Sequence, residues 1–164
     1  MPARPLPPPP DRTPSARLAE GPLRGLVGYQ LALATIVTDQ VFDDRAGREL
    51  RRVEFTILAL VHANPDVTAR QLARALAVTP PNIALWLERL VSRKLVARTR
   101  SPHDARMQHL RLTRSGAALV ERTMAALVEA EQATLEAHMS AAERAMLAEL
   151  LHKAAMARRR AEPG

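Results

Sequence analysis

The apolar residues that follow Thr68 repeat at the spacing of a short helix, with Leu72 and Leu76 on one face. Thr68 and Gln71 form a capping-box pair, because the hydroxyl and the amide of such residues satisfy each other's exposed backbone donors. The pattern therefore predicts a helix that begins near Ala69.

A second helical pattern starts within about three residues of the end of the first. Thr79 provides a hydroxyl cap, and Pro80 follows at a position where the first helical amides have no partner in any case. A connection this tight predicts a helix-turn-helix. The second helix separates its residues by face, with Ile83, Trp86, Leu87 and Leu90 toward the core and Asn82, Leu85 and Arg89 toward solvent.

The apolar period changes from helical to alternating after Lys94. Residues 95–100 are expected to form one strand and residues 109–112 a second, because apolar and polar side chains alternate in each. The intervening residues 101–106 are polar and contain Pro102, which predicts a loop. A helix-turn-helix followed by a basic hairpin is a winged helix.

Two more helices are predicted before the helix-turn-helix. Apolar residues recur at helical intervals through residues 23–42, and the run 43–47 is expected to break that helix. Residues 50–62 form the next helix, which residues 64–66 end. The residues expected to point inward from it are Val53, Ile57, Leu60 and Val61.

Two further helices are predicted after the hairpin. Thr113 is expected to cap a helix that runs to about His138, and Ser140 with Glu143 forms another capping box that opens a last helix. The apolar stripe of these helices is longer than one small domain can cover. A helix whose apolar face lacks a partner in its own chain usually finds one on a second copy, so we expect a homodimer.

The length of 164 residues favours one domain with a single core, and the aromatic content of 2% means that Leu, Ala, Val and Ile must build it. The expected fold class is mainly α with a small β-hairpin wing, that is, a winged helix-turn-helix whose terminal helices form a dimerisation platform. The expected division is a disordered proline-rich arm at residues 1–20, a first dimerisation helix at 21–46, the winged helix-turn-helix lobe at 47–113, terminal dimerisation helices at 114–159 and a tail at 160–164.

Positive charge is concentrated in the predicted winged helix. Residues 68–114 contain ten Arg and Lys against Glu88 and Asp104, a net charge of +8, whereas the whole chain carries +7 and the remainder therefore −1. A basic lobe on a nearly neutral body is the electrostatic pattern of a surface that binds nucleic-acid phosphates.

The chain has no cysteine, which excludes disulfides, thiolate metal sites, cysteine nucleophiles and thiol-based redox sensing. The five histidines are scattered, and there is neither a glycine-rich phosphate loop nor a nucleophile elbow, so we expect no enzyme, no metal and no other cofactor. No apolar stretch approaches the roughly 20 residues of a membrane span, and the N-terminus lacks the apolar core of a secretory signal. We therefore expect a cytoplasmic protein without a membrane partner.

The predicted wing resembles a family signature. The run from Asp104 to Thr113, followed by Gly116, is similar to the D-x-R-x-x-x-L-x-L-T-x-x-G wing of MarR-type transcriptional regulators. The residues at the family's spacing upstream are Leu76, Thr79, Leu90 and Arg98. The resemblance covers about residues 22–159 and implies a winged-helix DNA-binding lobe on a dimer in which the first and terminal helices interleave.

In a helix-turn-helix the second helix enters the major groove with its N-terminal turns at the base edges. The residues expected at the bases are Thr79, Pro80, Asn82, Leu85 and Arg89. The amide of Asn82 can pair with adenine, and Arg89 can bind guanine or phosphate. Members of the resembling family commonly carry threonine and arginine where this chain has Ala84 and Leu85, a difference that would change the sequence preference.

The remaining basic candidates lie at the end of that helix and in the wing. Arg93 and Arg98 are expected to hold phosphates, and Arg106 to reach an adjacent minor groove. His103 is interpreted as an exposed wing histidine near phosphate rather than as a metal ligand. Asp104 would repel phosphate, so its expected role is to set the structure of the wing.

These patterns predict a sequence-specific transcriptional regulator, a repressor, that binds inverted repeats of double-stranded DNA as a homodimer. The residues expected in the dimer interface are Leu26, Leu33, Leu127, Leu135, Leu147, Leu150 and Leu151. The resemblance also implies a small lipophilic or aromatic-acid ligand that releases the DNA, with Tyr29 and His62 as candidate lining residues. The alternative is a winged-helix protein-interaction module without specific DNA binding.

Overall fold

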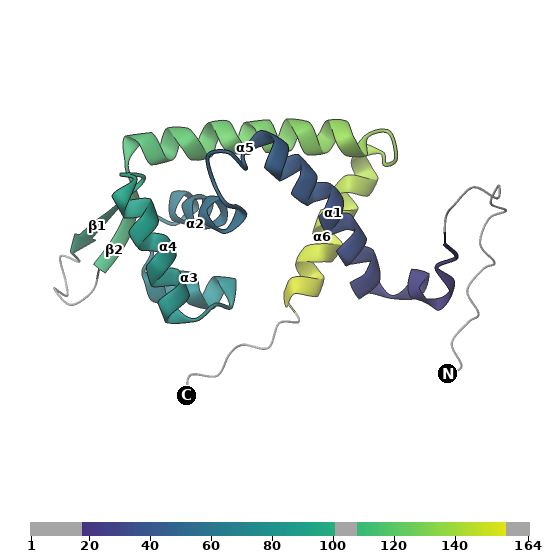
Figure 1. The fold of residues 1–164 in the computed structure, drawn as a ribbon, viewed down its shortest axis with the longest axis horizontal. Helices are drawn as coiled ribbons and strands as arrows, with labels where there is room; N and C mark the ends of the chain where they lie inside the picture. Colours follow the sequence, from purple (N-terminus) through teal and green to yellow (C-terminus); the bar gives the residue numbers. More distant parts are fainter. Residues whose placement is uncertain (1–17, 101–107, 157–164) are drawn as a thin grey trace. The chain divides into compact units, whose positions relative to one another are not determined.

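The computed structural model describes residues 18–100 and 108–156, and its elements confirm a mainly helical fold with one β-hairpin. Their order along the chain is η1 (Gly21–Gly25), α1 (Val27–Arg45), α2 (Arg52–Ala63), α3 (Ala69–Leu76), α4 (Pro80–Ser92), β1 (Val96–Arg100), β2 (Gln108–Leu112), α5 (Arg114–Leu135) and α6 (Ala141–Met156). The chain divides into two compact units, residues 1–40 and 41–164. Within the second unit, α2, α3, α4 and the hairpin gather near the N-terminal end of α5 (Figure 1).

The capping box predicted for the first helix of the helix-turn-helix is present. The backbone N–H of Thr68 donates to Oε1 of Gln71 at 2.8 Å, and the N–H of Gln71 donates back to the Thr68 hydroxyl at 3.3 Å. Helix α3 then ends at Ala77, whose left-handed backbone has a φ of 54°. The prediction of a helix from Ala69 with a tight turn after it is confirmed.

Helix α4 begins at Pro80 as predicted, but the hydroxyl of Thr79 does not cap it. A capping hydroxyl accepts from the amide of the second or third helical residue. Here the first two residues are Pro80 and Pro81, which have no N–H, so only the amide of Asn82 remains as a partner. The proline rings fix the start of α4 in place of the hydroxyl.

The hairpin pairs β1 and β2 in antiparallel register, with Val96 opposite Leu112 and Arg98 opposite Leu110. The first strand begins at Val96, one residue after the predicted start. The loop predicted at residues 101–106 lies outside the described residues. Leu110 also bridges to Val67, its N–H donating to the Val67 carbonyl at 2.9 Å, so the hairpin is fastened to the connection between α2 and α3.

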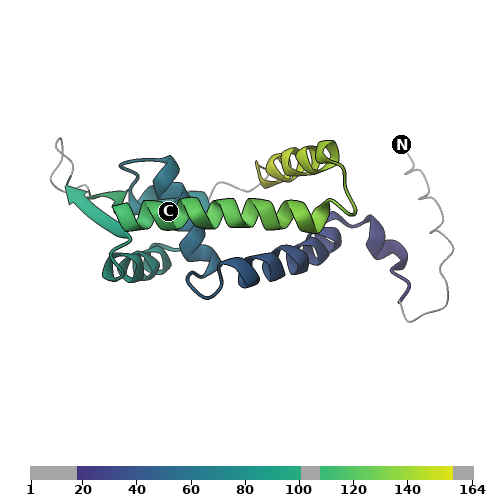
Figure 2. The ribbon, with the colours of Figure 1, turned by 90° about the horizontal axis from the view of Figure 1, so that it is seen from above.

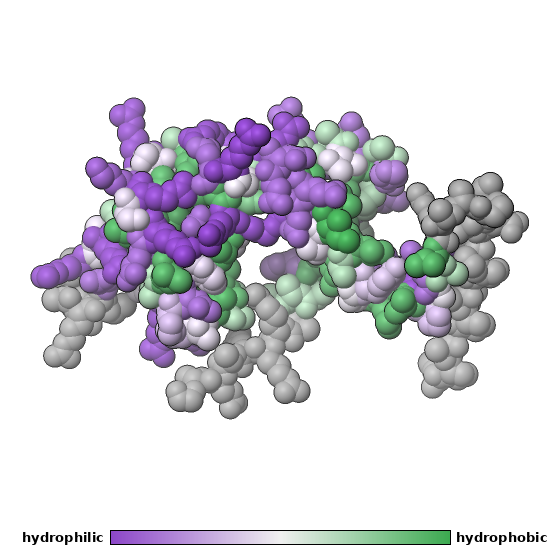
Figure 3. All heavy atoms as spheres, viewed as in Figure 1, coloured by the Kyte–Doolittle hydropathy of each residue, from purple (hydrophilic) through white to green (hydrophobic). Residues whose placement is uncertain are grey.

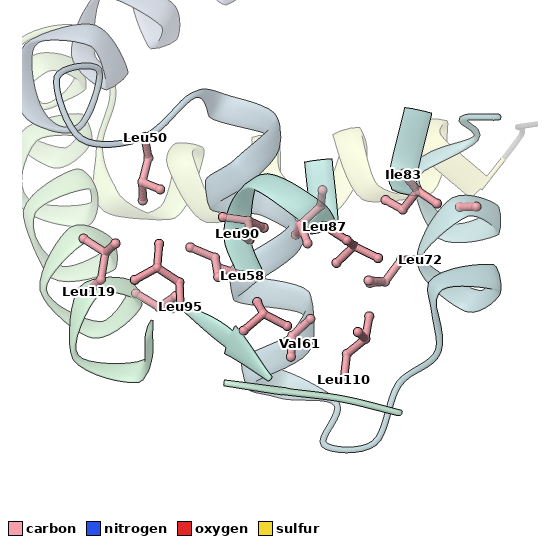
Figure 4. Packing of buried hydrophobic residues seen from close by; sticks show 14 residues of the cluster. Leu50, Leu58, Val61, Leu72, Ile83, Leu87, Leu90, Leu95, Leu110 and Leu119 are labelled. Carbon is pink, nitrogen blue, oxygen red and sulfur yellow. The ribbon is translucent and has the colours of Figure 1, made fainter. Parts of the chain in front are cut away.

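The core of the second unit forms where α2, α4, the hairpin and the first turns of α5 converge (Figure 4). Ile57, Leu58 and Leu90 are completely buried there. The inward positions predicted for Ile57 and Val61 are confirmed; Val53 and Leu60 also pack against the core but are only partly buried, and Leu58 is completely buried beside them. The inward face of α2 is wider than predicted because that helix packs against both α5 and β2 rather than against one neighbour.

The first helix departs from its predicted bounds at both ends. Residues 21–25 form a separate 3-10 turn, and α1 starts only at Val27 because Leu26 has an extended backbone. At the other end α1 continues through the expected break to Arg45. Phe42 and Ala46, four residues apart, both pack in a small second cluster with Leu127 and Ala130, and this helical spacing requires the turn between them to persist.

The two C-terminal helices start where predicted. The Thr113 hydroxyl accepts from the N–H of Gly116 at 3.0 Å, and α5 then runs unbroken to Leu135, three residues short of the predicted end (Figure 2). Ser140 and Glu143 form the predicted capping box, and the Ser140 hydroxyl lowers the pKa of the Glu143 carboxyl. None of the described helices is both long enough and apolar enough to cross a membrane.

Candidate nucleic-acid interface

The outward face of α4 is the central feature of the predicted interface. Asn82 and Leu85 are exposed, and Arg89 is partly exposed, while the opposite face of the same helix buries Ile83, Leu87 and Leu90. Thr79 and Pro80 are exposed at the start of the helix. The predicted separation of the two faces of α4 is confirmed, because each residue lies on the side that its helical position indicates.

The basic side chains of the hairpin also face solvent. Arg98 and Arg100 on β1 are exposed, on the same lobe as α4. His103, Asp104 and Arg106, the candidates in the wing loop, lie outside the described residues. The described part of the wing therefore offers two exposed arginines from β1.

Arg111 is not available as a free cation on the wing, because Asp66 holds it. Its Nε and Nη2 donate to the two carboxylate oxygens of Asp66 at 2.6 Å and 2.7 Å, an ideal bidentate geometry. The hydrogen bond from Arg111 is the main reason that the pKa of Asp66 lies below its usual value, and the nearby charges of Arg111 and His109 act in the same direction. Asp66 has a left-handed φ of 68°, and its carbonyl is bonded to Nδ1 of His109.

Arg93 is directed toward the protein as well. It forms the C-cap of α4, and its Nη2 donates to the Glu49 carbonyl at 2.8 Å. Its Nη1 lies 3.6 Å from Oε2 of Glu54, a carboxylate that is only 7% exposed and also accepts from the Arg51 N–H at 3.0 Å. These contacts fasten the end of α4 to the beginning of α2.

Glu49 extends this connection to the long helix. Its carboxylate accepts two hydrogen bonds from Arg122 of α5, at 2.8 Å and 3.0 Å. The segment before α2 therefore contacts α4 through Arg93 and α5 through Arg122. Both partners of the Glu49–Arg122 pair are 57% exposed, so the pair contributes at most about 1 kcal/mol to stability.

The junction between the start of β1 and the start of α5 is built from hydrogen bonds to the backbone carbonyls just before β1. The N–H of Thr113 donates to the Leu95 carbonyl at 3.0 Å, and its hydroxyl donates to the Lys94 carbonyl at 2.7 Å. Gly116 is buried against the Leu95 carbonyl, and a Cβ at this position would stand 2.0 Å from the oxygen of that carbonyl. The glycine at the end of the wing signature therefore has a steric cause, because α5 approaches the backbone of Leu95, just before β1, too closely for any side chain.

The residues predicted for dimerisation are mostly uncovered within the chain. Leu26 and Leu33 are 56% and 39% exposed, and the leucines of α6 are exposed too, with Leu147 at 36%, Leu150 at 52% and Leu151 at 38%. Hydrophobic residues are visible at the surface over α1 and α6 in Figure 3. Leu127 differs, because it is only 8% exposed and packs in its own chain against Val41, Phe42 and Ala46, while Leu135 is partly buried.

The two ligand candidates belong to different units of the chain. Tyr29 is partly buried in α1, and His62 is exposed near the end of α2. Nε2 of His62 lies 4.0 Å from a carboxylate oxygen of Glu121. His62 also lines a shallow hollow of about 280 Å³, together with Val61, Pro65, Arg111 and Leu112.

The ion pairs within the lobe could not be predicted from the sequence. Asp66 and Arg111 are 45 positions apart, and nothing in the local pattern of either residue indicates the other. Glu54 was also missed, because a single acidic residue within a helical pattern is normally assigned to the surface. The combination of an Asp in a turn and an Arg on an alternating strand was the available signal for the first pair.

Comparison with known proteins places these features in a family. The sequence model of the MarR family matches residues 49–107. The chain is 30% identical to a transcriptional repressor, CouR, whose structure is bound to a 23-mer DNA duplex, over 85% of this chain and 99% of that chain, with a TM-score of 0.77. A comparison with curated proteins found no match.

Two further solved structures are similar along most of their length. Bordetella bronchiseptica BpsR, whose DNA binding is regulated by 6-hydroxynicotinic acid, is 27% identical over 81% of this chain and 95% of its own, with a TM-score of 0.71. The MepR–DNA complex of S. aureus is 25% identical over 81% of this chain and 98% of its own, with a TM-score of 0.67. The similar proteins are regulators of transcription rather than enzymes.

Proposed function

The chain belongs to the MarR family and is a DNA-binding transcriptional regulator, and we propose that it acts as a homodimeric repressor on inverted-repeat sites. The observation that carries the proposal is the outward face of α4, where Asn82, Leu85 and Arg89 remain accessible on a lobe with a strong positive charge. The similarity to CouR, a repressor with DNA bound, supports the direction of regulation.

Each subunit would place α4 in one major groove. The exposed Thr79, Pro80 and Asn82 stand at the N-terminal end that approaches the base edges, and Arg89 follows about two turns later. Arg98, Arg106 and His103 would contact phosphates or the neighbouring minor groove, with Asp104 setting the wing. Two DNA-binding lobes on a symmetric dimer would bind half-sites about 10 base pairs apart or a multiple of that distance.

Arg93 has a different part in this proposal from the one that its sequence position suggested. Its guanidinium is engaged by Glu49 and Glu54, so its first role is to set the position of α4 against α2. A cation that is already paired with a buried carboxylate contributes little to the release of counterions from DNA. Both arginines are exposed, but among the described residues only Arg93 is paired with a carboxylate, that of Glu54. The salt dependence of binding therefore distinguishes Arg93 from Arg98.

Residues 47–113 would form the DNA-binding lobe, with residues 21–46 and 114–159 as the dimerisation helices. The exposed leucines at positions 26, 33, 147, 150 and 151 support this division, because uncovered apolar side chains on terminal helices fit a second copy of the chain. We do not assign Leu127 to the interface, since its own chain buries it.

A small aromatic acid would modulate the binding of DNA. The hollow beside His62, about 280 Å³ in volume, suits a ligand with a single ring, and the similarity to BpsR supports a ligand of this class. Tyr29 remains a candidate for the same role. The dimer can adopt different separations of its two DNA-binding lobes. A ligand that binds one separation more tightly shifts the equilibrium toward it, and it thereby changes the affinity for DNA without touching the duplex.

Selection of bound fragments from the source genome, followed by titration of one selected fragment, tests DNA recognition. Arg89→Ala should weaken that complex roughly 30-fold or more, because each subunit of the dimer loses a base contact worth about 1–3 kcal/mol. Arg48→Ala removes the same charge from an exposed site in the turn after α1 and should leave the affinity within about twofold. A monomeric protein that binds no fragment better than bulk DNA would contradict the proposal and favour a protein-interaction module.

The ligand is tested with 6-hydroxynicotinic acid as the first probe and other single-ring acids after it. Release of the selected fragment should occur in the wild type and be lost in His62→Ala, while His152→Ala, which removes an exposed histidine of α6, should respond like the wild type. Equal release from all three proteins would place the ligand site away from His62.

A further inference from the structure

Leu85 is unusual among the large hydrophobic residues of the DNA-binding lobe. It is 48% exposed, whereas Ile83 and Leu87 on the same helix are 2% and 1% exposed. Within residues 47–100 and 108–113, the described part of the lobe, no other large hydrophobic residue is exposed. The other exposed ones belong to the segment 18–37 and to α5 and α6.

The neighbours of Leu85 on the helix surface are mostly polar: Asn82, Glu88 and Arg89 are, whereas the exposed Pro81 is not. Asn82 precedes it by three residues and Arg89 follows by four, so the three side chains form one stripe. At a rise of about 1.5 Å per residue, they lie about 4.5 Å and 6 Å apart along the axis. Leu85 is thus a single apolar group between an amide and a guanidinium.

A protein partner does not fit so small a patch. A stable protein interface buries about 800 Å² on each side and has a cluster of apolar residues at its centre. One leucine between two polar side chains provides no such cluster. The major groove of DNA, in contrast, carries one isolated apolar group among hydrogen-bonding edges, the 5-methyl group of thymine.

From this match we infer that Leu85 contacts a thymine methyl group and makes the protein select a T·A pair in each half-site. The inference rests on the proposed entry of α4 into the major groove and specifies what that helix reads there. Since base pairs are stacked about 3.4 Å apart, the selected thymine lies within one or two pairs of the base that faces Asn82. Removal of one buried methyl group corresponds to about fourfold in affinity, and to about fifteenfold for two half-sites together.

Deoxyuridine provides the test, because it pairs as thymine does but lacks the methyl group. Each thymine of a selected fragment is replaced by deoxyuridine at the same position in both half-sites, and the affinity of the wild type is measured for every duplex. One position per half-site should show the loss of about fifteenfold. Leu85→Ala should bind the thymine and deoxyuridine duplexes at that position equally, while Asn82→Ala, a change on the same stripe, should retain the difference.

The variant Leu85→Ala is expected to unfold at the temperature of the wild type, because the side chain is exposed and alanine favours helix. Two results would overturn the inference: tolerance of deoxyuridine at every position by the wild type, or a methyl dependence that persists in Leu85→Ala. Failure of the proposed function is seen earlier and separately, as the absence of any selected fragment.

Discussion

Replacement of Gly116 by alanine tests how tightly the hairpin and α5 are joined. The added Cβ would stand 2.0 Å from the oxygen and 2.9 Å from the carbon of the Leu95 carbonyl. All of these atoms belong to the backbone or to the Cβ, so no rotamer change relieves the overlap. The start of α5 must move away from the Leu95 backbone by at least about 1 Å, which disturbs the hydrogen bonds from Thr113 to the Lys94 and Leu95 carbonyls.

In Gly116→Ala, the free-energy cost of this displacement exceeds the gain from the higher helix propensity of alanine over glycine. Overpacking of side chains costs about 1–3 kcal/mol, and a clash between main chains belongs at or above the upper end of that range. Alanine recovers about 1 kcal/mol through its helix propensity. A net loss of about 2 kcal/mol or more should lower the melting temperature by about 4–8 °C or more for a chain of this length.

Thermal and urea unfolding of Gly116→Ala and Gly28→Ala measure this difference. Gly28 is also helical, in α1, and a Cβ there meets nothing within 4 Å, so Gly28→Ala should be unchanged or more stable by up to about 1 kcal/mol. A melting temperature of Gly116→Ala within about 1 °C of the wild type would refute the steric explanation for this glycine.

Three further predictions concern the ion pairs and the apolar helices. Arg93→Ala should lower the free energy of unfolding by about 1–3 kcal/mol, because it leaves the Glu54 carboxylate buried with one partner fewer. It should not change the slope of log affinity against log salt, whereas Arg98→Ala should reduce that slope by about 0.9 for each phosphate that the variant no longer neutralises. Equal slopes for both variants would contradict the distinction between the two arginines. The pKa of Asp66 in the folded protein lies below its usual 3.8, so its contribution to stability is complete above that pH and fades as the pH falls through the folded pKa. Urea unfolding across a pH series should show Asp66→Asn less stable than the wild type at neutral pH, with the difference in unfolding free energy closing in acid. A difference that stays constant with pH would argue against the pair with Arg111. Leu150→Glu should yield monomers in sedimentation and weaken binding to an inverted repeat, while Lys153→Glu on the same helix should remain dimeric; a dimeric Leu150→Glu protein would remove α6 from the proposed interface.

The elements that could be predicted from the sequence are those with local signals. The Thr68–Gln71 capping box, the proline after Thr79 and the alternation around Leu110 each act over a few residues, and α3, α4 and the hairpin appear where these signals lie. The outward stripe of α4 could be predicted for the same reason, since helical periodicity alone separates Asn82 and Leu85 from the core.

The features that escaped prediction depend on packing between distant segments. The extension of α1 to Arg45 follows from contacts of Phe42 and Ala46 with α5, and the same contacts bury Leu127. Neither composition nor spacing indicates that residues near position 42 will meet residues near 130. The burial of Glu54 likewise depends on an arginine that follows α4, 39 positions later in the sequence.

The paired prolines that open α4 affect how the protein meets a duplex. Each ring locks φ near −65°, so the first turn of the helix has the same backbone shape before and after association. A flexible segment would lose about 1–2 kcal/mol of conformational entropy per residue on becoming ordered, and this turn has little left to lose. The end of α4 that is proposed to face the bases is therefore pre-organised, and no local folding step has to precede its binding to DNA.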